Sequence, residues 1–107
     1  MRHTGLGLIA LLALACSDTQ GPQTAVQRGE RIYRGTCTTC HALDPNEAGV
    51  LGPAVAGASV ELLEAKVVRG EYPPGYTPKR TTKQMSALPH LKDYIADLAA
   101  YLDSVKR

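Results

Sequence analysis

The fold of this chain depends above all on a five-residue motif, Cys37-Thr38-Thr39-Cys40-His41. The C-x-x-C-H pattern is the signature of covalent attachment of a c-type haem. Each thiol can form a thioether with one haem vinyl group, because the two-residue spacer lets both sulfurs reach the same porphyrin edge. His41 follows closely enough to ligate the iron from one side. The motif therefore predicts one covalently bound haem c, held by Cys37 and Cys40, with His41 as an iron ligand.

Three other uses of the two cysteines remain open from the sequence. A thioredoxin-like redox pair requires a βαβ context, and no β-rich run flanks this motif. A closed zinc site requires four ligands, for which the chain offers only His90 and, near the N-terminus, Cys16 or His3 beyond the motif. A structural disulfide between Cys37 and Cys40 is the third alternative. The motif together with an export signal favours haem over all three.

The N-terminal residues have the pattern of an export signal. A short basic start precedes an almost wholly apolar run, Leu6 to Ala15, which is too short to span a bilayer as a helix. The run ends in Leu-Ala-Leu-Ala-Cys, which resembles the lipobox of bacterial lipoproteins, although Ala13 stands where leucine is usual. Ala13-x-Ala15 also suits an ordinary signal peptidase. We therefore predict a signal peptide over residues 1–15, a flexible tether over 16–23 with Cys16 as a lipid anchor, and a folded domain over 24–107.

The expected domain is small and lacks large aromatic residues. It contains no Trp and no Phe, and a domain of this size buries only a modest share of its surface. A haem would supply the missing apolar core, so we expect the chain to fold poorly without it. Removing residues 1–15 takes away Arg2 alone among the charged residues and leaves a formal charge of +1. That balance excludes the basic footprint of a nucleic-acid-binding protein.

Three stretches of the domain have helical patterns. The first runs from Thr24 to Gly35, with Thr24 and Gln27 as a capping box. The second begins after Ser59, whose hydroxyl can cap it, and ends at Gly70. The third runs from Pro89 to the end of the chain, with an apolar stripe at spacings of three and four: Leu91, Tyr94, Ile95, Leu98, Tyr101, Leu102 and Val105. Residues 49–58 and 71–84 read as loops, the first lying on the haem.

The C-x-x-C-H motif and the order of the other features along the chain make the domain resemble a class I bacterial cytochrome c over about residues 25–105. The resemblance rests on a first helix with Gly29 and Tyr33, the C-x-x-C-H motif, Leu51-Gly52-Pro53, Met85, and a terminal helix containing Asp97 to Leu102. It implies an all-α fold in which three main helices wrap around one haem. It also implies that the first helix meets the terminal helix at Gly29, where the sequence alone left a tolerated surface glycine equally open.

The same resemblance assigns roles at the iron. It makes His41 the proximal ligand, Met85 the distal ligand, and the carbonyl of Pro53 the acceptor for the free ring N–H of His41, an interaction that tunes a ligating histidine. This chain departs from the family in that Ser86 follows Met85, with proline delayed to Pro89. His90 is the rival distal ligand, and bis-His ligation would lower the reduction potential.

Two axial protein ligands leave no open position on a haem iron. Such an iron suits one-electron transfer between respiratory partners and not catalysis. We therefore expect a periplasmic or exported electron carrier that is not an enzyme. The alternatives are a haem subunit of a larger oxidoreductase complex and a gas or redox sensor whose distal ligand is displaced. Lys79, Arg80 and Lys83 precede Met85, and they predict a basic rim that steers an acidic partner toward the haem edge.

Overall fold

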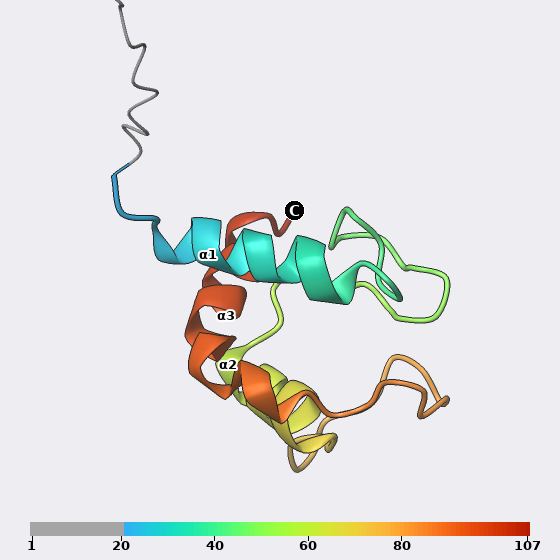
Figure 1. Ribbon diagram of the computed structural model, residues 1–107. Helices are drawn as coiled ribbons and strands as arrows, with labels where there is room; N and C mark the ends of the chain where they lie inside the picture. The colour runs from blue at the N-terminus through green and yellow to red at the C-terminus, as the bar shows by residue number, and fades with distance from the viewer. Residues whose placement is uncertain (1–20) are drawn as a thin grey trace, which may run out of the picture.

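The computed structural model describes residues 21–107 and folds them into a small all-helical domain (Figure 1). Its α-helices are α1, Ala25–Ile32; α2, Val60–Leu63; and α3, Ile95–Ser104. The all-α prediction with three main helices is confirmed. Among the described residues, no helix is long and apolar enough to cross a membrane. The predicted signal peptide, and Cys16 with most of the predicted tether, lie outside these residues.

The first helix begins where the sequence predicts. Thr24 is its N-cap, and the capping box is complete: the Gln27 N–H donates to Thr24 Oγ1 at 3.1 Å, and the Thr24 N–H donates to Gln27 Oε1 at 2.9 Å. The α-helical part ends at Ile32, and the chain continues as a π-helical turn over Tyr33–Cys37. Such turns are rare and often occur at functional sites, and this one leads directly into the C-x-x-C-H motif.

The second helix also has the predicted ends. Ser59 caps it by accepting a hydrogen bond from the Leu62 N–H at 3.1 Å. After Leu63 the chain continues as a π-helical turn over Glu64–Val68. Gly70 then adopts a φ of +71°, a backbone conformation that ends helices and that residues with a side chain rarely adopt.

The C-terminal segment differs in part from the prediction of one continuous helix. Pro89–Tyr94 forms a 3₁₀-helix with proline in its first turn, and the α-helix begins only at Ile95. Because a 3₁₀ turn has three residues rather than 3.6, the predicted stripe changes register there. Tyr94 consequently lies on the outside with 44% of its surface exposed, whereas Leu91 is buried. The predicted apolar stripe is confirmed at Leu98, Tyr101 and Leu102, which are buried.

Helices α1 and α3 cross at Gly29 (Figure 1). A Cβ on Gly29 would lie 2.0 Å from the carbonyl oxygen of Asp97 and 2.9 Å from the Cβ of Tyr101, so only glycine allows this approach. The rings of Tyr33 and Tyr101 pack beside the crossing with centroids 5.6 Å apart. The close approach of the first and terminal helices at Gly29 is therefore confirmed.

Ionic and polar contacts hold the ends of the domain. Arg28 makes two hydrogen bonds to the Asp97 carboxylate, at 2.9 and 3.0 Å. At the other end, Asn46 Nδ2 donates to the carbonyl of Val105 at 2.9 Å, and the N–H of Arg107 donates to Asn46 Oδ1 at 3.1 Å. The two contacts of Asn46 fasten the loop after the C-x-x-C-H motif to the C-terminus.

Candidate cofactor site

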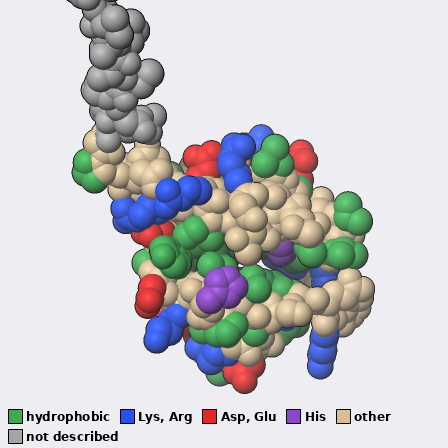
Figure 2. All heavy atoms as spheres, viewed as in Figure 1, with side chains coloured by type: hydrophobic (Ala, Val, Ile, Leu, Met, Phe, Trp, Pro, Cys, Tyr) green, Lys and Arg blue, Asp and Glu red, His purple; other side chains and the backbone are tan. Residues whose placement is uncertain are grey.

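A cavity of about 560 Å³ lies between the C-x-x-C-H turn, α2 and the two loops. Figure 2 shows the face of the domain hollowed between its upper and lower parts. The wall is mainly apolar, and it includes most of the residues that the sequence singled out: Cys37, Cys40, His41, Pro53 and Met85, together with Tyr33, Leu63, Val67, Leu98 and Leu102. This volume is within the range of about 300–1,000 Å³ that is typical of cofactor pockets.

The motif forms a tight turn at one edge of the cavity. The N–H groups of Cys40 and His41 both donate to the carbonyl of Cys37, at 3.2 and 2.9 Å. Thr38 donates its hydroxyl to the carbonyl of Arg34 at 2.8 Å and so joins the turn to the preceding π-helical segment. Both cysteine side chains are half-buried and line the cavity. The turn thus presents two thiols and one imidazole to the same space.

The state of the thiols bears on the alternatives to haem. Cys37 and Cys40 are free thiols, so the structure contains no disulfide between them. Burial raises the pKa of Cys37 to about 11, which keeps this thiol protonated near neutral pH and makes it a poor metal ligand and nucleophile. Within residues 21–107, no cluster of three or more His, Cys, Asp or Glu side chains could hold a metal ion. These observations do not favour a zinc site or a reactive redox pair.

The ring of His41 is held from behind by the following loop. Its Nδ1 lies 2.8 Å from the carbonyl oxygen of Pro53. Since that carbonyl can only accept, Nδ1 carries the proton and Nε2 is left as the free donor atom. Gly52 packs flat on the ring: a Cβ there would lie 2.5 Å from both Cε1 and Nδ1 of His41. The histidine is therefore fixed in both tautomer and direction.

Backbone contacts pin this loop to the motif. The N–H groups of Leu51 and Gly52 both donate to the carbonyl of Cys40, at 3.2 and 2.9 Å. A Cβ on Gly49 would lie 2.3 Å from the same oxygen. Gly52 belongs to the Leu51-Gly52-Pro53 stretch that carries the family resemblance, but the sequence predicts no contact for it or for Gly49. The pattern that could have indicated these contacts is the pair of glycines just before Pro53. Glycines in a loop often mark a backbone that another segment approaches closely.

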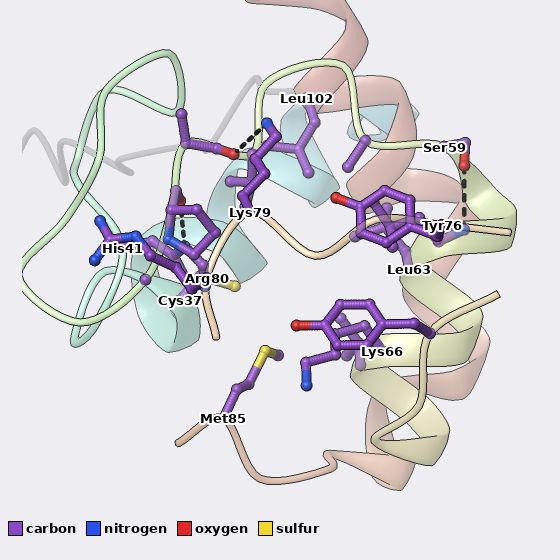
Figure 3. Close-up of a pocket in the computed structure, with 18 of the residues that line it drawn as sticks. Cys37, His41, Ser59, Leu63, Lys66, Tyr76, Lys79, Arg80, Met85 and Leu102 are labelled. Carbon is purple, nitrogen blue, oxygen red and sulfur yellow. Dashed lines mark hydrogen bonds between the residues drawn. The ribbon is translucent and has the colours of Figure 1, made fainter. Parts of the chain in front are cut away.

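The two candidate distal ligands lie in different surroundings. Met85 is half-buried and lines the cavity from the loop that precedes the 3₁₀-helix (Figure 3). His90 is exposed, and it is not among the residues that line the cavity. The structure therefore brings Met85, and not His90, to the space that His41 faces.

The predicted basic residues are only partly gathered at the cavity. Lys79 and Arg80 line it, and Lys79 Nζ donates to the carbonyl of Ala54 at 2.9 Å, which joins the two loops across the opening. Lys83 is exposed and does not line the cavity. Tyr33, whose hydroxyl needed a partner, donates to the carbonyl of Ala42. Burial, with a smaller effect of Cys37, raises the pKa of Tyr33 to about 12, so it remains a neutral donor.

The residues fit a covalently attached haem. Two unpaired thiols at one edge and an imidazole whose Nε2 is free are the donor set that attachment of haem c requires, and a thioether on the facing loop can serve as a second iron ligand. The apolar walls suit the large apolar surface of a porphyrin. The close approach of Gly52 leaves the His41 imidazole no other position. Bound here, a haem would complete a core that the protein residues alone leave open.

Comparison with known proteins agrees with this fit. The family model for cytochrome c matches residues 26–106. The match spans almost the whole described domain, from the first residues of α1 to the end of the chain. No curated protein and no solved structure gives a significant match.

Proposed function

Because the chain belongs to the cytochrome c family and so carries covalently bound haem c for electron transfer, we propose that it is a one-electron carrier with His/Met-ligated iron. The haem supplies the chemistry, a change between ferric and ferrous iron. The protein residues hold it, orient it and exclude water. The observation that carries the proposal is the His41 ring, whose Nδ1 lies 2.8 Å from the Pro53 carbonyl while two half-buried thiols share its turn.

Each residue of the turn has a separate task in this proposal. Cys37 and Cys40 form the two thioethers and fix one edge of the haem. His41 gives its Nε2 lone pair to the iron. Pro53 accepts a hydrogen bond from the Nδ1–H, which fixes the tautomer and direction of the ring and strengthens its donation. Gly52 allows the loop to close on the ring without a clash.

Met85 completes the proposed coordination. It is half-buried, it lines the cavity and it comes from the loop opposite the motif. A thioether ligand favours the ferrous state and raises the reduction potential. With both axial positions filled by protein, no position remains for a substrate or gas. This is why we propose a carrier and not an oxidase, peroxidase or sensor.

The electron partners and the location are part of the same proposal. Lys79, Arg80 and Lys83 would steer an acidic redox protein toward the cavity opening by long-range attraction. The sequence of residues 1–15 directs export to the periplasm, and lipidation of Cys16 would tether the domain to a membrane. A rate of electron transfer to acidic partners that does not change with ionic strength would contradict the steering.

The deciding experiment is the absorption spectrum of the periplasmically matured protein, oxidised and reduced. We expect a six-coordinate low-spin haem with the weak long-wavelength band of methionine-ligated ferric cytochromes, and no binding of carbon monoxide by the reduced form. A low-spin haem without that band would contradict Met85 ligation. Carbon monoxide binding would favour the sensor, and copurification with a catalytic protein would favour a subunit of a larger complex.

A further inference from the structure

Asn46 lies in the loop after the C-x-x-C-H motif, and the proposed function gives it no role. It is half-buried and does not line the cavity. Its Nδ2 donates to the Asp44 carboxylate at 3.0 Å and to the carbonyl of Val105 at 2.9 Å, and its Oδ1 accepts from the N–H of Arg107 at 3.1 Å. A carboxylate cannot donate and a hydroxyl has one hydrogen, so neither could satisfy these three partners. The site therefore selects an amide.

The peptide bond between Pro45 and Asn46 carries these contacts to the next loop. Its N–H donates to the Asp44 carboxylate at 2.9 Å. Its carbonyl, that of the buried Pro45, accepts hydrogen bonds from the N–H groups of both Val55 and Ala56, each at 2.9 Å. Because a peptide bond is planar, the N–H and the carbonyl cannot turn independently. Whatever fixes Asn46 therefore also fixes the direction of the Pro45 carbonyl.

The segment that receives these two hydrogen bonds also holds the His41 ring. Pro53, at its start, accepts from His41 Nδ1 at 2.8 Å. At its end, the N–H of Gly57 donates to the carbonyl of Leu102 in α3 at 2.8 Å. The segment is thus suspended between the Pro45 carbonyl and α3, and Asn46 binds the end of the same helix. Because a hydrogen bond weakens steeply when its angle is poor, a displaced Pro45 carbonyl would weaken the contact at the ring.

We propose that Asn46 is a positioning residue for His41. It fixes the Pro45 carbonyl against the end of α3, and this in turn holds the Pro53 carbonyl in line with the ring N–H. The proposal rests on the ligation of iron by His41 proposed above. Asn46 makes no hydrogen bond to the ring and does not line the cavity, so it acts through the loop alone. Because the hydrogen bond on the far side of a ligating histidine tunes its donation, this remote amide affects the reduction potential.

The test is Asn46→Ala in the haem-loaded protein, with two measurements at the His41 ring. A potentiometric titration gives the reduction potential. The NMR spectrum of the reduced protein, whose low-spin ferrous iron is diamagnetic, gives the resonance of the ring Nδ1–H. We expect the potential to rise, because a ring with a weaker hydrogen bond donates less to the iron and stabilises the ferric state less. The Nδ1–H resonance should move away from its wild-type position.

Three further variants separate positioning from a general loss of stability. Thr24→Ala removes the cap of α1 and lowers the thermal midpoint, but it should leave the potential and the resonance unchanged. Arg107→Ala loses the ion pair with Asp44 but keeps the N–H that Asn46 accepts, and it should also change neither. Asn46→Asp keeps that acceptor and loses both donors, so it is the milder variant if alanine prevents folding. It should move the resonance, and it is assessed by NMR because its added charge itself lowers the potential.

Failure of this inference differs from failure of the proposed function. If Asn46→Ala carries covalent haem with the wild-type potential and the wild-type Nδ1–H resonance, Asn46 does not position the ring, and electron transfer is untouched. The inference is equally wrong if Thr24→Ala, at a matched loss of thermal stability, shifts both quantities as far as Asn46→Ala. If the wild-type protein carries no covalent haem, or if His41 does not ligate its iron, both proposals fail together.

Discussion

Replacing Gly52 by alanine tests the contact that holds the His41 ring. The new Cβ would lie 2.5 Å from Cε1 and Nδ1 of His41. Carbon atoms that are not bonded normally stay roughly 3.5 Å apart, so the ring and the loop must separate by about 1 Å. That shift would stretch the 2.8 Å contact between His41 Nδ1 and the Pro53 carbonyl beyond hydrogen-bond range.

The cost follows from these two effects. Overpacking a close contact costs about 1–3 kcal/mol, and losing a hydrogen bond costs about 0.5–1.5 kcal/mol. We therefore expect Gly52→Ala to lower the free energy of unfolding by roughly 2–4 kcal/mol. A histidine whose N–H has lost its acceptor is a weaker donor to the iron. The ferric state is then less stabilised, so the reduction potential should rise.

Both quantities can be measured on one preparation of haem-loaded protein. Denaturation in guanidinium chloride gives the stability, and a potentiometric titration gives the potential. Gly49→Ala is the control for loop strain, because the three atoms nearest to its Cβ would be backbone atoms of Cys40, His41 and Ala42, at 2.3–2.7 Å. It should lose stability with little change in potential. The reasoning is refuted if Gly52→Ala unfolds at the wild-type denaturant concentration and keeps the wild-type potential.

Three further predictions concern the helix crossing, the distal ligand and acid stability. Gly29→Ala should destabilise the protein by about 1–3 kcal/mol through overpacking, although alanine is the better helix former, whereas Gly35→Ala, with no atom within 4 Å of its Cβ, should not. Met85→Ala should remove the long-wavelength band, lower the potential and allow carbon monoxide to bind the reduced haem. Hydrogen bonding from Arg28 holds the pKa of Asp97 below its usual value. That stabilisation is complete above the unfolded pKa of about 4 and is lost as the pH falls through the folded-state pKa, so Asp97→Asn should weaken the acid dependence of the unfolding midpoint.

Each of these predictions has a control and a contrary result. His90→Ala should leave the spectrum of the iron unchanged, and a spectrum altered as in Met85→Ala would contradict the Met85 assignment. Asp93→Asn removes an exposed carboxylate and should retain the acid dependence. If Asp97→Asn also retains it, the ion pair contributes nothing measurable. A Gly29 variant that is as stable as wild type would show that α1 and α3 separate without cost.

The parts of the fold that local chemistry decides could be predicted from the sequence. The capping box at Thr24, the cap at Ser59 and the glycine stop at Gly70 each depend on residues within four positions. The turn at Asp44 depends on equally local chemistry, since the Asp44 carboxylate accepts a hydrogen bond from the Asn46 N–H at 2.9 Å, although this turn is not among the elements predicted above. The α1–α3 crossing became predictable only through the family resemblance, because Gly29 by itself was equally consistent with a surface position.

The parts that depend on distant residues could not be predicted. The hydrogen bond from Lys79 to Ala54 spans 25 residues, and no pattern within either loop indicates it. The stacking of Lys66 on Tyr72 depends on how the chain returns after Gly70. The 3₁₀ form of Pro89–Tyr94 was missed because the apolar residues of that segment fit both helix types, and only the exposure of Tyr94 separates them.

The two walls of the cavity differ in how firmly they are held, and this difference bears on electron transfer. The His41 wall is fixed by three contacts within one short loop: Leu51 and Gly52 bond to the Cys40 carbonyl, and the ring meets Pro53. On the Met85 wall, no described backbone–backbone hydrogen bond involves residues 77–87. The segment is anchored by the exposed Lys79 side chain on the Ala54 carbonyl and, at its end, by the Leu88 N–H on the Val67 carbonyl at 2.6 Å. Local opening is easiest where such bonds are few. If Met85 ligates the iron as proposed, its loop should therefore open before the turn that holds Cys37, Cys40 and His41.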